Sequence, residues 1–165
     1  MSVTTTSRVG AAWAVLDTVL DPEVPALSLR DLGIVREVNE CEQGLEVVLT
    51  PTYSGCPATE VIQASVREAL AAVALGPVTV TQRLAPAWTT DWISDEGRRK
   101  LRDYGIAPPG AVAAEATVRF RPRGIACPRC GSTQTERLSA FGSTACKALY
   151  RCLACREPFE HFKAI

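Results

Sequence analysis

Two Cys-x-x-Cys pairs near the end of the chain place the strongest restriction on how it can fold. Cys127 pairs with Cys130 and Cys152 with Cys155, and twenty-one residues separate the two pairs. Each tight turn brings two sulfurs within reach of one ion, so the four thiolates predict a closed, structural zinc site. A four-cysteine iron centre or a redox dithiol remains open as the alternative. We expect a zinc ribbon here, with a small sheet built from residues 118–121, Tyr150 and Phe159.

Three further cysteines and the single histidine lie outside this set. A total of seven cysteines indicates metal or thiol chemistry in the cytosol rather than a disulfide framework. Cys146, beside Lys147, is either a packed cysteine, which we favour, or a second exposed thiol. His161 lies six residues beyond Cys155 and is interpreted as an ordinary ribbon residue rather than a ligand. Cys41, at a polar strand end, is assigned no role.

The charge of the chain is unevenly distributed, although the formal net charge is zero. Residues 1–116 carry nine Lys and Arg against fifteen Asp and Glu, whereas residues 117–165 carry nine against three. This asymmetry, together with the Pro-Pro-Gly sequence at 108–110, predicts a boundary between two domains. We therefore expect a first domain over residues 1–110 and a zinc ribbon over residues 111–165.

The first eighty-odd residues read as a helix, two strands, a second helix and a third strand. Hydrophobic spacing predicts helices over residues 11–20 and 57–75, and alternation predicts strands over 34–42, 45–52 and 78–84, with a tight turn at 43–44. This order favours an α+β fold in which a small mixed sheet carries its helices on one face.

A cysteine lies at the junction between the second strand and the second helix. Gly55 allows a sharp turn, and Pro57 suits the first helical position, so Cys56 falls at or just before a helix start. The unpaired N–H groups and positive dipole end of a helix favour a thiolate, which makes an exposed Cys56 a candidate functional thiolate. The alternative is a small buried cysteine that only packs at the turn.

A loop with two tryptophans follows the third strand and leads to a polar helix over residues 94–104, which Gly105 ends. Large aromatic side chains bury much area, so Trp88 and Trp92 are expected to anchor the loop on the core. A lid over Cys56 is the alternative.

Several classes of protein are disfavoured by what the sequence lacks. No stretch approaches the ~18 apolar residues of a membrane span and the first residues lack a leader pattern, so a cytoplasmic protein is expected. A pI of 6.6, without aromatic residues interleaved among basic ones, argues against a nucleic-acid footprint. There is neither a Glu-x-x-His pair nor a Gly-x-Gly-x-x-Gly fingerprint, so the chain is not expected to carry an oxygenation site itself.

Four motifs together resemble the SufT-like family of iron-sulfur assembly factors: DPEVP at 21–25, DLGIV at 31–35, TPTYSGCP at 50–57 and WTTDWI at 88–93. With FGST at 141–144 and EPF at 157–159, the chain is similar to the PaaD family of the phenylacetyl-CoA epoxidase system in bacterial phenylacetate degradation. The resemblance extends from about residue 13 to residue 163.

The resemblance implies an accessory protein that helps to mature the iron or iron-sulfur centres of the epoxidase. Its partners would be the oxygenase and reductase subunits and the iron-sulfur assembly machinery; a homo-oligomer is left open. Cys56 would handle iron, a cluster or sulfur transiently, with Asp21 and Glu23 as supporting polar groups. The competing hypothesis is a binding module whose ribbon docks a protein or nucleic acid while Cys56 is structural. A thiol-transfer enzyme is disfavoured, because no histidine near in sequence could serve as base.

Overall fold

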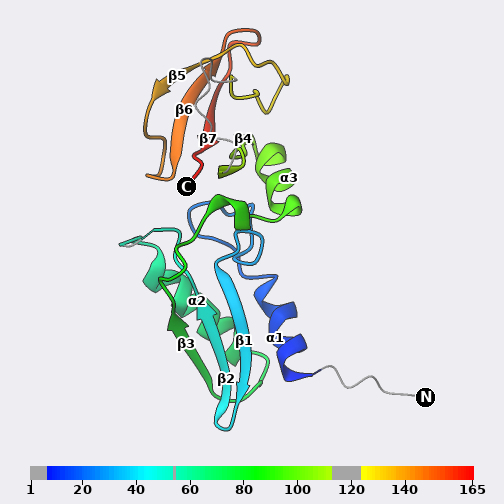
Figure 1. Cartoon of the computed structure of the whole chain (residues 1–165). Helices are drawn as coiled ribbons and strands as arrows, with labels where there is room; N and C mark the ends of the chain where they lie inside the picture. Colours follow the sequence, from blue (N-terminus) through cyan, green and yellow to red (C-terminus); the bar gives the residue numbers. More distant parts are fainter. Residues whose placement is uncertain (1–6, 54, 113–123) are drawn as a thin grey trace, which may run out of the picture. The chain divides into compact units, whose positions relative to one another are not determined.

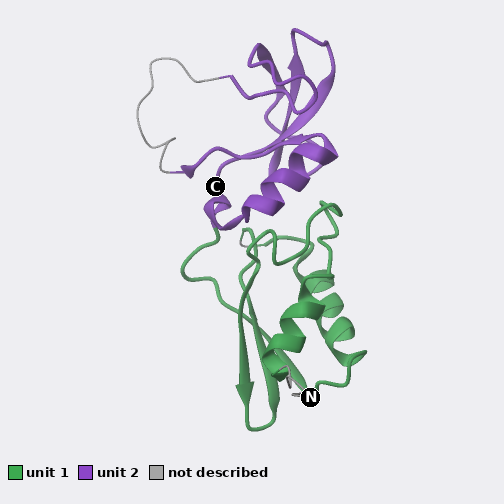
Figure 2. Ribbon diagram, turned by 90° about the vertical axis from the view of Figure 1, so that its right-hand side faces the viewer, with its two compact units in different colours: residues 1–88 green, residues 89–165 purple. Residues whose placement is uncertain are grey.

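The chain forms two compact units, residues 1–88 and residues 89–165 (Figure 2). The structure is a computed structural model, and it describes residues 7–53, 55–112 and 124–165. The strand expected over residues 118–121 lies outside the described residues. No helix within the described ranges is long and apolar enough to cross a membrane.

Unit 1 is built on a three-stranded sheet in the order β1-β2-β3 (Figure 1). β1 (Val35–Cys41) pairs antiparallel with β2 (Gly44–Leu49), and β2 pairs parallel with β3 (Val78–Gln82). The parallel pairing requires a crossover, which the helix between β2 and β3 supplies. The mixed sheet expected from the sequence is therefore confirmed.

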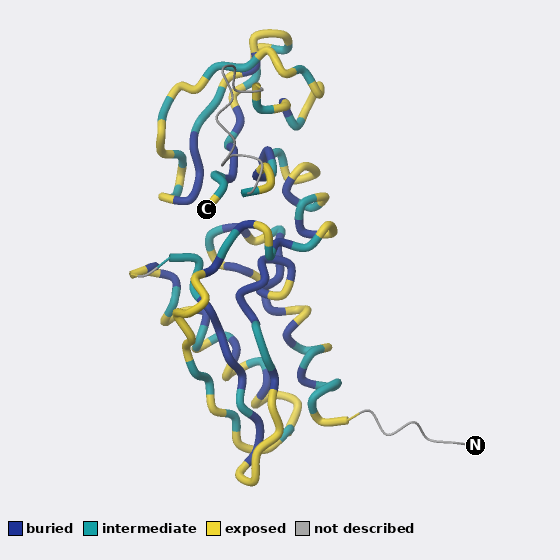
Figure 3. Tube along the Cα trace, in the orientation of Figure 1, coloured by how far each residue is buried: buried dark blue, intermediate teal, exposed yellow. Residues whose placement is uncertain are grey.

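Two helices cover one face of this sheet, as Figure 2 shows. They are α1 (Arg8–Leu16) and α2 (Thr59–Ala71). The Ser7 hydroxyl caps α1 by accepting the Gly10 N–H at 3.1 Å. Figure 3 shows buried residues along most of β2 and in the upper part of β1, while the tip of their hairpin is exposed. The fully buried side chains of the core include Leu16, Leu27, Leu29, Leu32, Ile34, Leu45, Val47, Val66 and Leu70.

The first helix is shorter than the expected range of 11–20. It ends at Leu16, after which the Thr18 hydroxyl donates to the Val15 carbonyl at 2.7 Å. Val19 is buried and its carbonyl accepts the Leu29 N–H, while Leu20 forms an isolated bridge with Ser28 and is 53% exposed. Tertiary pairing with the following loop therefore overrides the helical period at residues 19–20.

The second helix is also shorter than the expected range of 57–75. It begins at Thr59 behind an N-cap at Ala58, so Pro57 is not the first helical residue. It ends at Ala71, and Ala74 then adopts a positive φ of 52°. In the first hairpin, Cys41 pairs with Gly44, which places the two-residue turn at 42–43 rather than at 43–44.

Unit 2 contains a four-stranded sheet in the order β4-β7-β6-β5. The strands are β4 (Ile106–Ala107), β5 (Thr135–Ser139), β6 (Lys147–Cys152) and β7 (Pro158–Phe162). β5, β6 and β7 form an antiparallel meander, and β4 pairs parallel with β7. A short 3-10 helix, η1 (Thr90–Trp92), and α3 (Asp95–Tyr104) precede β4.

The polar helix expected over residues 94–104 is confirmed as α3. The Ser94 hydroxyl accepts the Gly97 N–H at 2.9 Å, and Gly105 ends the helix with a left-handed φ of 91°. A side chain with Cβ rarely adopts this conformation, so glycine suits the position.

Residues 89–110 belong to the same compact unit as the ribbon, although the sequence-based division at residue 110 placed them in the first domain. The reason is hydrogen bonding at both ends of this segment. Ile106 and Ala107 pair with β7, and the Ile165 carbonyl accepts the Thr90 N–H at 3.1 Å and the Thr89 hydroxyl at 2.8 Å. Arg98 further ties α3 to the carbonyls of Thr90 and Pro109. Neither pairing has a signal in the local sequence pattern.

Candidate functional site

The four cysteines of the two Cys-x-x-Cys pairs come together at one end of the unit 2 sheet. Cys127 and Cys130 lie in the turn before β5, Cys152 ends β6, and Cys155 lies in the turn before β7. Their sulfurs all lie within 4.8 Å of one another. In the parts of the chain that the structure describes, no second group of three or more Cys, His, Asp or Glu side chains converges in this way.

The spacing of these sulfurs fits a tetrahedral zinc ion. The Sγ atoms of Cys127 and Cys155 are 3.8 Å apart, and those of Cys130 and Cys152 are 3.5 Å apart. Four thiolates at a Zn–S distance of about 2.3 Å on tetrahedral corners would be about 3.8 Å apart. The donor set and the separations therefore match a closed structural zinc site with no open position for a substrate.

The thiols of this cluster do not ionise alike. The pKa of Cys152 is lowered to about 6, mainly by a hydrogen bond from the Cys155 backbone N–H to its sulfur. The Ala154 N–H adds to this effect, and burial opposes it. A hydrogen bond from the Glu157 backbone favours the Cys155 thiolate. Burial and hydrogen bonds with the other cysteine sulfurs outweigh it and raise the pKa of Cys155 to about 12. Closely packed thiolates repel one another, so a cation is needed for all four to be ionised together.

The cysteine cluster continues into the small core of the ribbon. Cys127 and Cys152 are 2% and 0% exposed and pack with Ala107 of β4 and Phe159 of β7. Ile125 and Tyr150 cover this core from its edge. So small a core buries little apolar surface, and ribbons of this size depend on their metal for stability.

His161 lies in β7 and is not a member of the metal cluster. Its side chain is buried, and its ring packs edge-on against Tyr150 at 5.6 Å between centroids. Its Nε2 atom has no hydrogen-bond partner among the residues that the structure describes. Burial lowers the pKa of His161 to about 4, so the imidazole is neutral near pH 7.

Cys146 is a packed residue rather than an exposed thiol. It is 6% exposed, and its sulfur lies 3.0 Å from the Thr144 hydroxyl. Lys147 does not serve a thiolate, because its ammonium lies 2.9 Å from the Glu160 carboxylate and is itself buried. Sequence reasoning missed this ion pair; the signal for it was a lysine directly before the apolar residues 148–150.

Cys56 lies three residues before the first residue of α2, in the turn that leaves β2. Its backbone N–H donates to the Tyr53 carbonyl at 3.3 Å, and its own carbonyl accepts the Thr59 N–H at 3.2 Å. Ala58, the N-cap residue of α2, makes no side-chain hydrogen bond to the helix N-terminus. Cys56 is only 9% exposed, so the exposure that a reactive thiolate needs is not present in this conformation.

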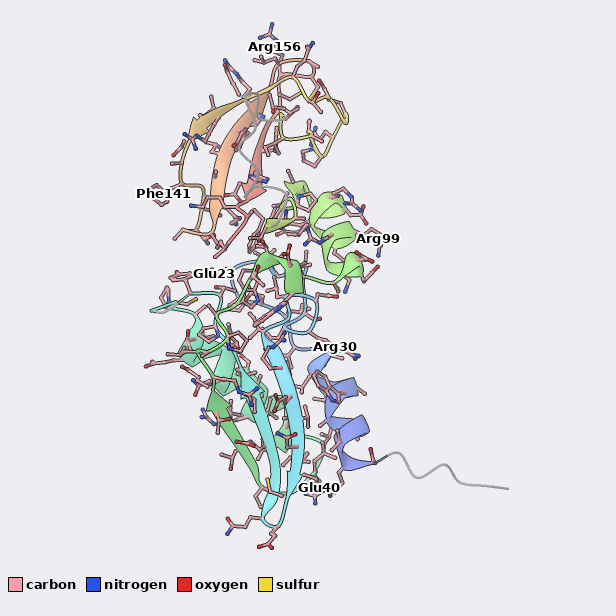
Figure 4. The ribbon with its side chains drawn as sticks, viewed as in Figure 1. Glu23, Arg30, Glu40, Arg99, Phe141 and Arg156 are labelled. Atoms are coloured by element: carbon pink, nitrogen blue, oxygen red, sulfur yellow. The ribbon has the colours of Figure 1, made fainter. Side chains whose placement is uncertain are left out.

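Asp21 and Glu23 lie in the loop after α1, where Figure 4 labels Glu23. Asp21 is buried, and its Oδ1 atom accepts the backbone N–H groups of Glu23 at 2.9 Å and Val24 at 2.7 Å. The carboxylate thus fixes the turn of its own loop. Within the described residues, Asp21, Glu23 and Cys56 do not form a ligand cluster.

Trp88 anchors its loop on the core of unit 1, as expected. It is 4% exposed, and its indole N–H donates to the Leu32 carbonyl at 2.9 Å. This contact ties the segment after β3 to the loop that contains Asp31 and Gly33. Trp92 belongs to η1 of unit 2 and is partly buried there.

Comparison with known proteins assigns each part of the chain to a class. Residues 11–81 match a family model described as iron-sulfur cluster assembly protein, and residues 111–163 match one described as PaaD zinc beta ribbon domain. A crystal structure of a domain of unknown function, DUF59, from Bacillus anthracis superposes with a TM-score of 0.54 at 24% identity. It covers 58% of this chain and 92% of its own, and it supports the α+β fold of the first unit. The chain thus combines an iron-sulfur assembly domain with a zinc ribbon.

Two curated relatives narrow this class. An Escherichia coli protein provisionally named as a subunit of 1,2-phenylacetyl-CoA epoxidase is 49% identical over 158 residues, covering 96% of this chain and 94% of the relative. An Fe-S protein maturation auxiliary factor of Porphyromonas gingivalis is 33% identical over 88 residues, covering 52% of this chain and 83% of the relative. The chain belongs to the PaaD family of phenylacetyl-CoA epoxidase subunits, as the motifs had suggested.

Proposed function

We propose that this chain is an accessory factor that helps to assemble the iron or iron-sulfur centres of a phenylacetyl-CoA epoxidase in phenylacetate degradation. The observation that carries the proposal is the combination of the two family matches in one chain with a full-length relative named as an epoxidase subunit. The partners would be the oxygenase and reductase subunits and the iron-sulfur assembly machinery, in the cytoplasm.

The ribbon contributes a structural metal to this function. Cys127, Cys130, Cys152 and Cys155 would hold one zinc ion, which supplies folding free energy and leaves no open coordination position. Zinc in this site stabilises a surface for partners and takes no part in chemistry. Iron or a cluster is the cargo of the protein and would not reside in the ribbon.

Cys56 is the proposed point of contact with that cargo. A thiolate is a suitable transient ligand for iron and acceptor for sulfur, and the α2 N-terminus next to it favours negative charge. Since Cys56 is 9% exposed, transfer requires that its turn opens when a partner binds. Asp21 and Glu23 would support the step indirectly, because Asp21 holds the loop on which Glu23 lies.

The burial of Cys56 also favours a second candidate function. In this version the chain is a binding module, Cys56 only packs at the turn, and the ribbon docks a protein. The two versions differ in one respect that can be measured: only the first requires the sulfur of Cys56.

The test replaces Cys56 with Ala in cells that produce the epoxidase and depend on this chain. The loss of so short a side chain leaves a small cavity, so fold and zinc content should be kept. We expect less iron per epoxidase complex and less epoxide formed. The matched control is Cys41→Ala, which removes an exposed thiol at the end of β1 and should change neither quantity.

Asp21→Ala and Glu23→Ala would follow as weaker variants of the same step. Wild-type iron content and epoxide formation with Cys56→Ala would remove the thiol from the mechanism and leave the binding module ahead. Binding of the unaltered chain to polynucleotide and heparin across a salt series would show whether that module serves nucleic acid instead.

A further inference from the structure

The end of the β5–β6 hairpin carries the most exposed large aromatic or aliphatic side chain in the described part of the chain. Phe141 is 65% exposed, and Leu138, three residues earlier, is 50% exposed. Figure 4 shows Phe141 projecting from unit 2 at the end of the sheet away from Arg156. We call Arg137, Leu138, Phe141 and Lys163 the hairpin-end patch.

The loop that presents Phe141 is held firmly by neighbouring strands. The Ser143 N–H donates to Glu160 Oε1 at 2.5 Å, the Gly142 N–H donates to the Lys147 carbonyl at 2.7 Å, and the Phe141 N–H donates to the Ser139 hydroxyl at 3.1 Å. Glu160 in turn pairs with the buried ammonium of Lys147 at 2.9 Å. A partly buried ion pair thus fixes a loop whose central side chain faces solvent.

Close packing reinforces this arrangement at Gly142. A Cβ atom there would lie 2.5 Å from Glu160 Oε1 and 3.3 Å from the Cβ of Lys147. The glycine therefore lets the loop approach the ion pair closely. A loop ordered in this way loses little conformational entropy when it binds a partner.

Leu138 and Lys163 are two further members of the patch. The register between β5 and β6 shifts between Arg137 and Ser139, which leaves Leu138 as the extra residue of a bulge. Bulges redirect side chains, and here the result is an exposed leucine. The Lys163 ammonium lies 4.6 Å from the centre of the Phe141 ring and 3.2 Å from the Ala140 carbonyl.

The charges of the ribbon favour an acidic partner. Residues 124–165 contain three glutamates, and each pairs with a cation of the same unit. The pairs are Glu136 with Arg151, Glu157 with Arg129 and Glu160 with Lys147. In the described part of the chain, no carboxylate pairs with Arg137 or Lys163. The patch thus combines two exposed apolar side chains with two cations that pair with no carboxylate among the described residues.

We propose that the hairpin-end patch docks a folded protein whose surface presents an apolar recess bordered by carboxylates. Phe141 fills the recess, Leu138 extends the apolar contact, and Arg137 and Lys163 meet the carboxylates. A rigid aromatic anchor with cations at its border is the usual composition of a binding hot spot. The inference rests on the proposed function, which supplies the partner: one of the epoxidase subunits.

A nucleic acid fits the patch less well. Electrostatic binding to a phosphate backbone uses several cations along a stripe, whereas the patch offers two. Leu138 has no role in stacking on bases, and a single aromatic ring is a poor platform for successive nucleotides. An acidic protein surface makes use of all four side chains.

The experiment measures binding of the full-length, zinc-loaded chain to the purified oxygenase and reductase subunits of the epoxidase. Phe141→Ala should weaken the affinity by about ten-fold or more, as truncation of a hot-spot aromatic does. Arg137→Glu should weaken it and reduce its dependence on salt. Leu84→Ala is the matched control, because Leu84 is 60% exposed in unit 1 and should leave the affinity unchanged.

The side chains changed in these three variants are all exposed, so zinc content and thermal unfolding should match those of the unaltered chain. If the unaltered chain binds the subunits and Phe141→Ala binds within about two-fold of it, the patch is not the docking site, while the proposed function stands. If the unaltered chain binds neither subunit, the proposed function fails and the inference with it. Binding to single-stranded polynucleotide that Phe141→Ala abolishes would also overturn the proposed protein partner.

Discussion

Replacement of His161 by Leu should remove a loss of stability at acidic pH. The imidazole is buried in β7 against Tyr150, its Nε2 atom has no hydrogen-bond partner in the described part of the chain, and burial lowers its pKa to about 4. The unfolded chain binds a proton at His161 with a pKa of about 6.5, more readily than the fold does. The fold is therefore destabilised as the pH falls below about 6.5, until His161 protonates in the fold near 4.

The size of this effect follows from the two pKa values. Lowering the pKa from 6.5 to about 4 corresponds to at most about 3 kcal/mol between the extremes of pH. Between about pH 7.5 and about pH 5, His161 lowers the free energy of unfolding by about 2 kcal/mol. Leucine has nearly the volume of histidine and no polar atom to bury unpaired. His161→Leu should therefore leave the free energy of unfolding at neutral pH almost unchanged or raise it by up to about 1 kcal/mol.

The assay is urea unfolding of the unaltered chain and of His161→Leu at both pH values, with zinc held at one concentration and unit 2 followed by zinc release. Ligand thiols also take up protons at low pH, but they do so in both chains. The difference between the two chains therefore isolates His161. If both lose the same free energy of unfolding between the two pH values, the burial argument for His161 is refuted.

Three further changes test the fold. Cys127→Ser should lose the metal and unfold unit 2 while unit 1 stays folded; full zinc content with unchanged thermal unfolding would contradict the site. Leu70→Ala should lower the free energy of unfolding of unit 1 by about 3 kcal/mol, because Leu70 is fully buried in α2; a loss below about 1 kcal/mol in urea unfolding would argue against that packing. Trp88→Phe should cost about 1–3 kcal/mol by the same measurement, since the buried Leu32 carbonyl loses its indole donor; an unchanged midpoint would show that water replaces it.

Local signals predicted the parts of this fold that depend on local chemistry. Gly105 ends α3 as predicted, because a left-handed glycine acts within one turn of the helix. The two Cys-x-x-Cys pairs predicted the cysteine cluster for the same reason, since each knuckle forms its own turn. The mixed sheet followed from the order of its elements.

Features that depend on distant residues were missed. Leu20 continues the helical period of α1, yet the chain turns away because Val19 and Leu20 pair with residues of the next loop. The pairing of β4 with β7 joins segments more than fifty residues apart and moves residues 89–110 into the ribbon unit. Lys147 and Glu160 lie on different strands, and only the fold shows that they meet.

The depth at which Cys56 is buried could likewise not be predicted from the sequence. The Gly-Cys-Pro sequence indicated a turn before a helix, which the structure contains, but local sequence carries no information on how deeply a turn is covered. The central prediction is that the Cys56 side chain handles iron or sulfur during assembly.

The most direct measurement of that claim uses purified components without oxygen. Epoxidase subunits produced in cells without this chain would be supplied with ferrous iron and a sulfide source, together with the intact chain, the Cys56→Ala variant or no addition. Iron per epoxidase complex would then be measured over time. We expect the intact chain to speed iron incorporation, and Cys56→Ala to match the sample without the chain. Incorporation with Cys56→Ala as fast as with the intact chain would contradict a role for the Cys56 sulfur, and equal rates in all three samples would contradict a maturation role altogether.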